Sequence, residues 1–315
     1  RSNIKPGVTK GAVKWIITPN VVADWMYQPV IQTSQIGYHP TQDKEAVIEM
    51  DIRDNRKETA QIIRIDADGE KVVKNVTPAN WGKFLRYNYL KVNFTDVKEP
   101  GLYKIKYNTS VSPIFRIDND VYARGVWQPV LEYFLPVQMC HMRVNEKYRV
   151  WHDCCHMDDA QMAPAHNHID GYDQKEGLSK FKPGEVVPGV NIGGWHDAGD
   201  FDLRIESQAG ESYILALAYE AFHPNLDVTS IDQINRVTEI HQPDGKNDLL
   251  QQVENGALTV VNGYLALGRL YRGIICNDLR QYVLLGDAAA MTDGKIGNED
   301  DRWIFTEDNP GRELS

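Results

Sequence analysis

The stretch GGWHDAGDFD, residues 193–202, places two acids, Asp197 and Asp200, three residues apart in a segment broken by glycines. It has too little apolar content for a core strand, and its glycines do not suit a helix interior. Gly199 permits a sharp bend, so both carboxylates can face one small space. Such a pair can hold a water molecule as a general base or bind a metal ion. A surface turn in which an Asp caps the next helix is the alternative.

The neighbours of the acid pair bear on this choice. Gly193 and Gly194 allow close approach of the backbone to another element. Trp195 and Phe201 provide either apolar packing surface or a face on which a sugar ring can stack. Arg204 and Glu206 follow directly, and an ion pair from them can orient the acids. These neighbours favour a functional loop over a simple turn.

The bulk composition limits the class of protein. The chain has 315 residues and 42% hydrophobic residues, enough for two domains or one large one with a true core. Its formal net charge is -10, which argues against nucleic acid or an anionic membrane surface as the main partner. No segment is long and apolar enough to span a bilayer, and the first ten residues lack the apolar core of a signal peptide. A mature, exported protein fits this pattern.

The chain divides into three parts by its patterning. Residues 1–28 are a linker or the tail of an upstream region. Residues 29–118 contain short alternating strands, with EAVIEM as one candidate and a hairpin turn at Asp68-Gly69, and this is typical of a β-sandwich. Residues 119–315 contain helices and a long irregular stretch from Arg143 to Asp200, and loops of that length are usually functional or disordered.

Three helical segments are expected in the last part. The first, within 122–140, is interrupted near Pro129 and Pro136. The second carries an apolar face, and so does the third, which begins near Asn247 and Asp248. The residues expected to face inward are Ile214, Leu217, Ala218 and Ala221 on the second helix and Leu250, Val253, Ala257, Val260, Val261 and Tyr264 on the third. Three helices are too few to bury their apolar faces in a closed core. We therefore expect this chain to be part of a longer polypeptide.

Three of the four cysteines fall within sixteen residues, beside several histidines, which suggests a metal more than a disulfide framework. Cys140, Cys155, His156 and His196 form a two-Cys, two-His set of the kind that holds structural zinc. Buried thiols or a disulfide between the two cysteines are the alternatives. His152 and Cys154 are spare candidate ligands, and Cys276 is expected to be a buried thiol. A zinc hydrolase is disfavoured, because the chain has no H-E-x-x-H pair and four ligands leave no open position.

Several of these motifs together resemble glycoside hydrolase family 9, the cellulase family whose core is an (α/α)6 barrel. GGWHDAGDFD is similar to its signature, and CCHMDDA at residues 154–160 and NDLLQQVENGALTVV at residues 247–261 resemble other barrel segments. SQIGYHPTQDKEAVI and GLYKIKY followed by SPIFRID resemble the start and end of the immunoglobulin-like domain that precedes the barrel in one branch. The resemblance implies an immunoglobulin-like β-sandwich at 29–118 and the N-terminal part of the barrel at 119–315.

The resemblance also implies an inverting mechanism. Asp200 would be the general base that activates the attacking water, and Asp197 would help to hold it. The general acid across the scissile bond, roughly 6.5–9.5 Å away in inverting enzymes, would be a Glu beyond Ser315, because Glu307 and Glu313 do not match the family's motif. This chain alone would therefore lack efficient hydrolysis.

Metal ions and substrates follow from the same resemblance. Some members of this branch bind zinc through residues matching Cys140, Cys155, His156 and His196, where an ion would brace the loop that aims the acids. Calcium is a further candidate near Thr306 and Asp308, without named ligands. The expected activity is endo-acting cleavage of β-1,4 bonds in cellulose, mixed-linkage glucan or xyloglucan by a secreted, periplasmic or cell-surface enzyme. An exo-acting glucosidase or glucosaminidase and a non-catalytic carbohydrate-binding relative are the alternatives.

Overall fold

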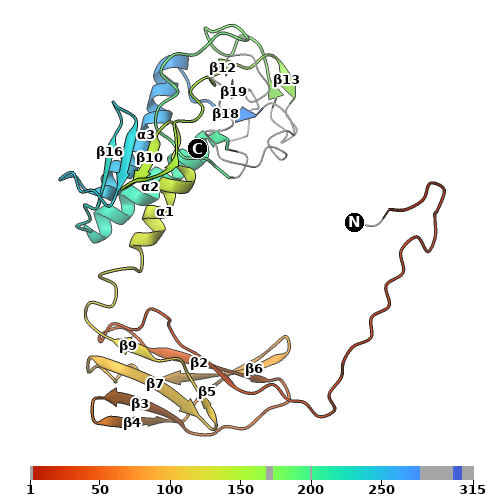
Figure 1. Cartoon of the computed structure of the whole chain (residues 1–315), viewed down its shortest axis with the longest axis vertical. Helices are drawn as coiled ribbons and strands as arrows, with labels where there is room; N and C mark the ends of the chain where they lie inside the picture. The colour runs from red at the N-terminus through yellow and green to blue at the C-terminus, as the bar shows by residue number, and fades with distance from the viewer. Residues whose placement is uncertain (1–2, 168–172, 199–200, 277–300, 307–315) are drawn as a thin grey trace. The chain divides into compact units, whose positions relative to one another are not determined.

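The computed structural model describes residues 3–167, 173–198, 201–276 and 301–306 (Figure 1). The chain forms two compact units, Arg1–Val126 and Trp127–Ser315. Among the described residues, no helix combines the length and apolar character needed to cross a membrane.

The first unit is a sandwich of two antiparallel sheets. One sheet has the order β1-β2-β6-β5, with β1 at Val30–Gln32, β2 at Glu45–Asp51, β6 at Tyr87–Asn93 and β5 at Ala79–Phe84. The other has the order β4-β3-β7-β8, with β4 at Gly69–Val76, β3 at Ala60–Asp66, β7 at Gly101–Tyr107 and β8 at Ser110–Val111; β9, Phe115–Ile117, also pairs with β7.

Alternate side chains along these strands form the sandwich core, as expected for the short alternating strands of this region. On β6, Leu90 and Val92 are buried, and on β7, Tyr103, Ile105 and Tyr107 are buried. This follows from the two-residue period of a strand, which sends every second side chain inward. The hairpin predicted at Asp68-Gly69 joins β3 to β4, with Asp66 paired to Gly69.

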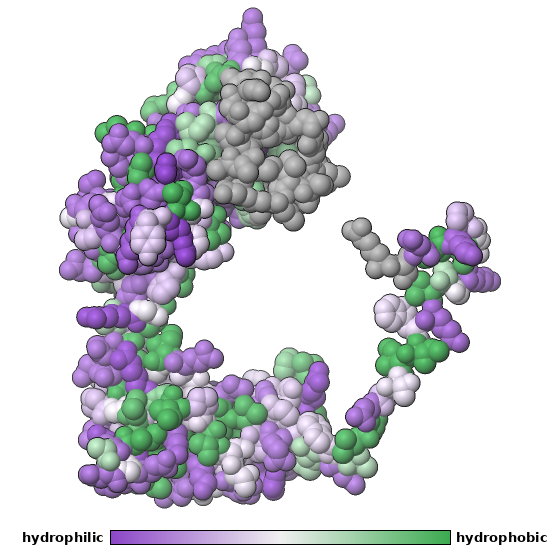
Figure 2. All heavy atoms as spheres, in the orientation of Figure 1, coloured by the Kyte–Doolittle hydropathy of each residue, from purple (hydrophilic) through white to green (hydrophobic). Residues whose placement is uncertain are grey.

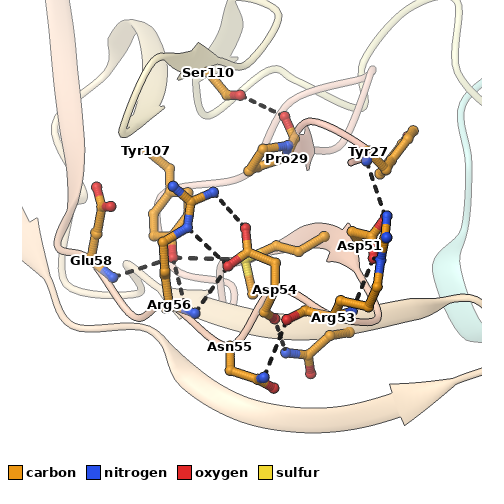
Figure 3. Close-up of polar contacts among 12 residues, drawn as sticks. Tyr27, Pro29, Asp51, Arg53, Asp54, Asn55, Arg56, Glu58, Tyr107 and Ser110 are labelled. Atoms are coloured by element: carbon orange, nitrogen blue, oxygen red, sulfur yellow. Dashed lines mark hydrogen bonds and ion pairs between the residues drawn. The ribbon is translucent and has the colours of Figure 1, made fainter. Parts of the chain in front are cut away.

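The segment before β1 contacts the sandwich through Tyr27 (Figure 3). The backbone N–H of Tyr27 donates to Oδ2 of Asp51 at 3.1 Å, and Asp51 also accepts from Arg53 at 2.9 Å. The hydrogen bonds from Arg53 and, to a smaller extent, the one from Tyr27 hold the pKa of the Asp51 carboxyl well below its usual range. The chain further upstream contains no helix or strand between residues 3 and 25, and several of its hydrophobic residues are at the surface (Figure 2). Trp15, Ile16 and Ile17 are among the exposed residues.

The second unit contains α1 at Gln128–Gln138, α2 at Ile205–Phe222 and α3 at Asp248–Leu267, with α2 packed on α3. One sheet has the order β11-β10-β17-β16, formed by Arg149–His152, Arg143–Glu146, Val237–Ile240 and Thr229–Asp232. Another has the order β12-β19-β18-β15, formed by Gln161–Met162, Arg302–Phe305, Gly273–Cys276 and Leu203–Arg204. A small pair joins β13, His166–Asn167, to β14, Asp173–Gln174.

Two expectations about this unit need correction. The stretch from Arg143 to Asp200 is not irregular throughout, because it contains β10 to β14. Neither proline interrupts α1: Pro129 lies in the first turn, where its missing N–H is not needed, and Pro136 lies inside the helix close to its end.

The inward faces predicted for α2 and α3 are also wrong, because none of the residues predicted to face inward is buried. Ile214 is 66% exposed and Val261 is 52% exposed. On α3 the buried residues include Gln252, Asn255 and Thr259, whose side chains form hydrogen bonds with Trp195, Gly194 and Tyr271 respectively. The predicted cap is confirmed, since the Asn247 side chain accepts from the N–H of Leu249 at 3.1 Å.

Candidate active site and metal centre

The loop at residues 193–197 is fixed to the helices through Trp195. The backbone N–H of Trp195 donates to Oε1 of Gln208 at 2.8 Å, and Nε2 of Gln208 donates back to the Trp195 carbonyl at 2.8 Å. The indole N–H donates to Oε1 of Gln252 on α3 at 3.0 Å. Trp195 is 1% exposed, so the sugar-stacking alternative is wrong for this residue and the apolar-packing alternative holds.

Gly193 and Gly194 allow this loop to lie directly on α3, as their pattern predicted. A Cβ on Gly193 would lie 2.3 Å from the carbonyl oxygen of Asn255, and both glycines have positive φ. Gly194 donates its N–H to the same carbonyl at 2.8 Å, and the Asn255 side chain donates to the Gly194 carbonyl at 3.1 Å. Any larger residue would push the loop away from the helix.

Asp197 emerges from this buried scaffold with its side chain 33% exposed. Its backbone N–H donates to the Asp202 carbonyl at 2.7 Å, which closes the loop on itself. Oδ2 lies 3.1 Å from Nε of Arg204, and Oδ1 accepts from the Ser207 hydroxyl at 3.3 Å. Asp200, the second acid of the pair, lies outside the described residues.

The two charged residues after the signature have different partners. Arg204 contacts Asp197, as its position suggested, and its Nη2 lies 3.6 Å from Oδ2 of Asp202. Glu206 instead pairs with Arg272 at 3.2 Å, so it does not orient the acids directly.

A residue that the sequence did not single out, Glu211, lies one turn after Ser207 on the same face of α2. Its Oε2 is buried and has no hydrogen-bond partner among the described residues. Burial, and then the charge of Asp197, raise the pKa of Glu211 to about 7. A carboxyl with that pKa close to an acidic loop is a common feature of functional sites.

The four predicted metal ligands, Cys140, Cys155, His156 and His196, come together. One ligand atom from each lies within 4.8 Å of the others, and all four residues are buried. The Sγ atoms of Cys140 and Cys155 are 3.5 Å apart, and both thiols are free. Nδ1 of His156 lies 2.9 Å from Sγ of Cys140, and Nε2 of His196 lies 3.3 Å from Sγ of Cys155.

This geometry fits a four-coordinate ion. Two thiolates on one tetrahedral zinc lie roughly 3.8 Å apart, given Zn–S bonds of about 2.3 Å, so small shifts accommodate the ion. Burial lowers the pKa of His156 to about 3, which keeps its imidazole neutral and able to ligate. The hydrogen bond with Cys140 holds the pKa of Cys155 well below its usual range, whereas burial raises that of Cys140.

The spare candidates lie outside this cluster. Nδ1 of His152 lies 2.9 Å from the Asp153 carbonyl, and the Cys154 thiol contacts the Arg236 carbonyl at 3.9 Å. Cys276 is a buried thiol, as predicted. His141 is one of the histidines that stand beside the cysteines in the sequence, and it lies near the cluster: its Nδ1 lies 2.7 Å from the Gly193 carbonyl, and its ring centroid lies 6.2 Å from that of His156.

Buried polar side chains connect the cluster to the acidic loop. Nε2 of His156 lies 3.8 Å from Oδ2 of Asp159, and Oδ1 of Asp159 accepts the backbone N–H of Arg302 at 2.9 Å. The Arg302 guanidinium lies 3.6 Å from Asp202, which in turn contacts Arg204. Asp158, Asp159 and Asp301 also group their carboxylates within 4.8 Å. No local pattern in the sequence indicates this network, because its central link joins Asp159 to Arg302, 143 residues further along the chain.

An aromatic cluster lies next to the predicted calcium region. His166 packs against Trp303 and Phe305, with ring centroids 5.9 and 6.1 Å away, and Phe305 is fully buried, so these aromatic residues belong to the core. Thr306 is buried and its N–H donates to Gln174. Asp308, Glu307 and Glu313 lie outside the described residues.

Comparison with known proteins identifies a domain in the N-terminal part of the chain. Residues 26–112 match the family model of the cellulase N-terminal Ig-like domain. No curated protein matches the chain.

Solved structures extend the likeness beyond that domain. A GH9 protein of Bacteroides ovatus has a TM-score of 0.59 and 19% identity, covering 88% of this chain and 45% of its own. A Zn-binding triple mutant of the GH family 9 endoglucanase J30 has a TM-score of 0.57 and 22% identity, and the J30 endoglucanase itself 0.56 and 20%. Both matches cover 85% of this chain and 44% of the J30 chain.

These findings confirm the resemblance to the branch of glycoside hydrolase family 9 that has an N-terminal immunoglobulin-like domain. They also confirm the fold class, an immunoglobulin-like β-sandwich followed by part of an (α/α)6 barrel. The chain spans somewhat less than half the length of the structures that it matches.

Proposed function

We propose that this chain carries part of the active site of an inverting glycoside hydrolase that cleaves β-1,4-glucosidic bonds in β-glucans. The observation that carries the proposal is the presentation of Asp197. Its carboxylate is exposed, it is held between Arg204 and Ser207, and the loop that bears it is anchored in the core through Trp195. A rigid support for an exposed acid is what positioning of a reactant requires.

In the proposed mechanism, Asp200 removes a proton from water as that water attacks the anomeric carbon. Asp197 accepts a hydrogen bond from the same water and keeps it aimed. The leaving oxygen takes its proton from a carboxylic acid across the bond, at a separation of roughly 6.5–9.5 Å in inverting enzymes. We place that acid on a Glu beyond Ser315.

Zinc is the ion that we propose for Cys140, Cys155, His156 and His196. The set of two thiolates and two imidazoles suits zinc, and one of the similar structures is described as a Zn-binding mutant. When bound, such an ion supplies a closed tetrahedral cross-link with no position for substrate. Because His196 directly precedes Asp197, its fixed imidazole would restrain the backbone that presents the acid.

Hydrolysis of a panel of soluble β-glucans by the full protein that carries this chain tests the proposal, beside its Asp200→Asn variant. We expect wild-type activity and a loss of at least a hundredfold in the variant, because the base can no longer accept a proton. Activity that survives the substitution would exclude Asp200 as the base. Tight glucan binding without hydrolysis by the wild type would instead favour the non-catalytic carbohydrate-binding relative.

The product pattern separates the remaining alternatives. Internal cleavage of mixed-linkage glucan or xyloglucan supports an endo-acting glucanase, and release of single sugars supports an exo-acting glucosidase or glucosaminidase. We propose a secreted, periplasmic or cell-surface location, since polysaccharide substrates lie outside the cell. Calcium near Thr306 remains a proposal without assigned ligands.

A further inference from the structure

The outer face of the β1-β2-β6-β5 sheet carries a continuous line of aromatic side chains. Tyr87 and Tyr89 point outward from β6, because the buried Asn88 and Leu90 alternate with them. Neighbouring ring centroids along the line are 6.4, 5.2, 6.1 and 5.6 Å apart. We call this line the aromatic row; in spatial order its members are Trp25, Tyr27, Tyr87, Tyr89 and Trp81.

The two ends of the aromatic row are open to solvent. Trp25 is 60% exposed and Trp81 is 57% exposed. Beside Trp81 lies a shallow pocket, lined by Val47, Trp81, Phe84, Tyr89 and Lys91. Contiguous apolar surface of this kind on a soluble protein usually marks a binding site.

The polar groups of this face are already paired. Glu49 accepts hydrogen bonds from the hydroxyls of Tyr27 and Tyr89, at 2.9 and 3.3 Å. Lys91 forms an ion pair with Glu45 at 2.9 Å. Because Glu49 is held by neutral hydroxyls and the charge of Lys91 is neutralised by Glu45, the face complements an uncharged ligand and not a polyanion.

We propose that the aromatic row binds a single chain of soluble β-glucan. The C–H face of a pyranose ring is apolar and packs on aromatic rings, while its hydroxyls stay in water. The choice of β-glucan rests on the proposed function, but binding here requires no catalytic residue. The row would hold the polysaccharide on the immunoglobulin-like domain as a second carbohydrate site.

The angles between rings decide which form of glucan fits. Neighbouring rings along the row are inclined by 61°, 58°, 64° and 89°, so they do not form one plane. A flat crystalline cellulose surface needs coplanar rings. A single chain can rotate successive sugars about its glycosidic bonds and so meet inclined rings in turn.

Affinity electrophoresis in gels containing xyloglucan or mixed-linkage glucan tests this proposal, with microcrystalline cellulose sedimentation in parallel. All variants carry Asp200→Asn, so the polysaccharide is not cleaved. We expect Trp81→Ala and Trp25→Ala to weaken binding to soluble glucan at least fivefold each. The matched control is Trp15→Ala, which removes a Trp that is 82% exposed but lies outside the row; it should retain the parental affinity.

Three results would overturn the proposal. The first is equal affinity of Trp81→Ala and Trp15→Ala for soluble glucan. The second is binding of the parental protein to crystalline cellulose but not to soluble glucan. The third is a fall in thermal stability of Trp81→Ala with unchanged affinity, which would assign the row to packing within the protein. None of these results bears on hydrolysis. Activity that depends on Asp200 would stand even if the aromatic row bound no glucan.

Discussion

Nε of Arg204 lies 3.1 Å from Oδ2 of Asp197, and the same guanidinium reaches Oδ2 of Asp202 at 3.6 Å. Arg204 therefore links the exposed acid to a fully buried one. A planar guanidinium with several N–H donors fixes the direction of a carboxylate better than a point charge does. Within the proposed function, Arg204 is a positioning residue for Asp197.

Arg204→Met should therefore lower kcat on soluble β-glucan at least tenfold with little change in KM, because the substrate-binding surface is untouched while the aim of Asp197 is lost. Arg204→Lys should recover part of the loss. Steady-state kinetics of the full protein measure both values. A rise of at least tenfold in KM with unchanged kcat would show that Arg204 contacts substrate instead.

Gly256 on α3 provides a test of how the loop is seated. A Cβ at this position would lie 2.2 Å from Cζ3 of Trp195 and 2.3 Å from the Ser212 hydroxyl oxygen. Gly256→Ala should lower the free energy of unfolding by about 1–3 kcal/mol, the usual cost of overpacking. The matched control is Gly210→Ala in the interior of α2, where a Cβ meets no atom within 4 Å.

Gly210→Ala should be neutral or stabilising by roughly 0.5–1 kcal/mol, because alanine favours the helix over glycine. Denaturant unfolding measures both variants. If they behave alike, Trp195 does not pack against α3 as described.

Metal content tests the zinc proposal with two adjacent cysteines. The purified protein should contain about one equivalent of zinc per chain. Cys155→Ser should lose the metal and unfold at a lower temperature, because a buried four-ligand set is broken. Cys154→Ser should keep the metal and the wild-type unfolding temperature, since Cys154 lies outside the cluster. A fully folded, metal-free wild-type protein would refute the zinc assignment.

The pH dependence of stability tests the environment of Glu211. Its pKa is raised to about 7 in the fold, against 4.5 for the unperturbed side chain. Between these values the folded state holds a proton that the unfolded state has released, so stability falls as pH rises through this window. Glu211→Gln should remove this fall. Relative to wild type, the free energy of unfolding of the variant should be higher by about 1 kcal/mol at pH 8 and unchanged at pH 4. The figure at pH 8 is reduced to allow for screening by solvent, because Glu211 is only partly buried.

Thermal unfolding of Glu211→Gln and wild type across pH 4–8 measures this difference. Glu254→Gln is a control, because Glu254 is exposed on α3. A constant offset between Glu211→Gln and wild type at all pH values would contradict a raised pKa.

The sequence alone determined the local structure and the kinds of chemistry. Alternation of apolar and polar residues indicated the β-sandwich and, within it, the strand EAVIEM that forms most of β2, because successive side chains of a strand point to opposite faces of the sheet. The spacing and types of Cys140, Cys155, His156 and His196 indicated a metal set, and Gly193 and Gly194 indicated a close approach.

Only the tertiary structure decided which helix faces are buried and what surrounds the acid. The apolar pattern of α3 predicted Val261 inside, yet Gln252 and Asn255 are buried because they bond Trp195 and Gly194. Likewise, the links from His156 through Asp159 and Arg302 to Asp202 join distant segments, and no local pattern encodes them. A buried polar residue is stable only beside a specific partner, and such partners are brought together by folding.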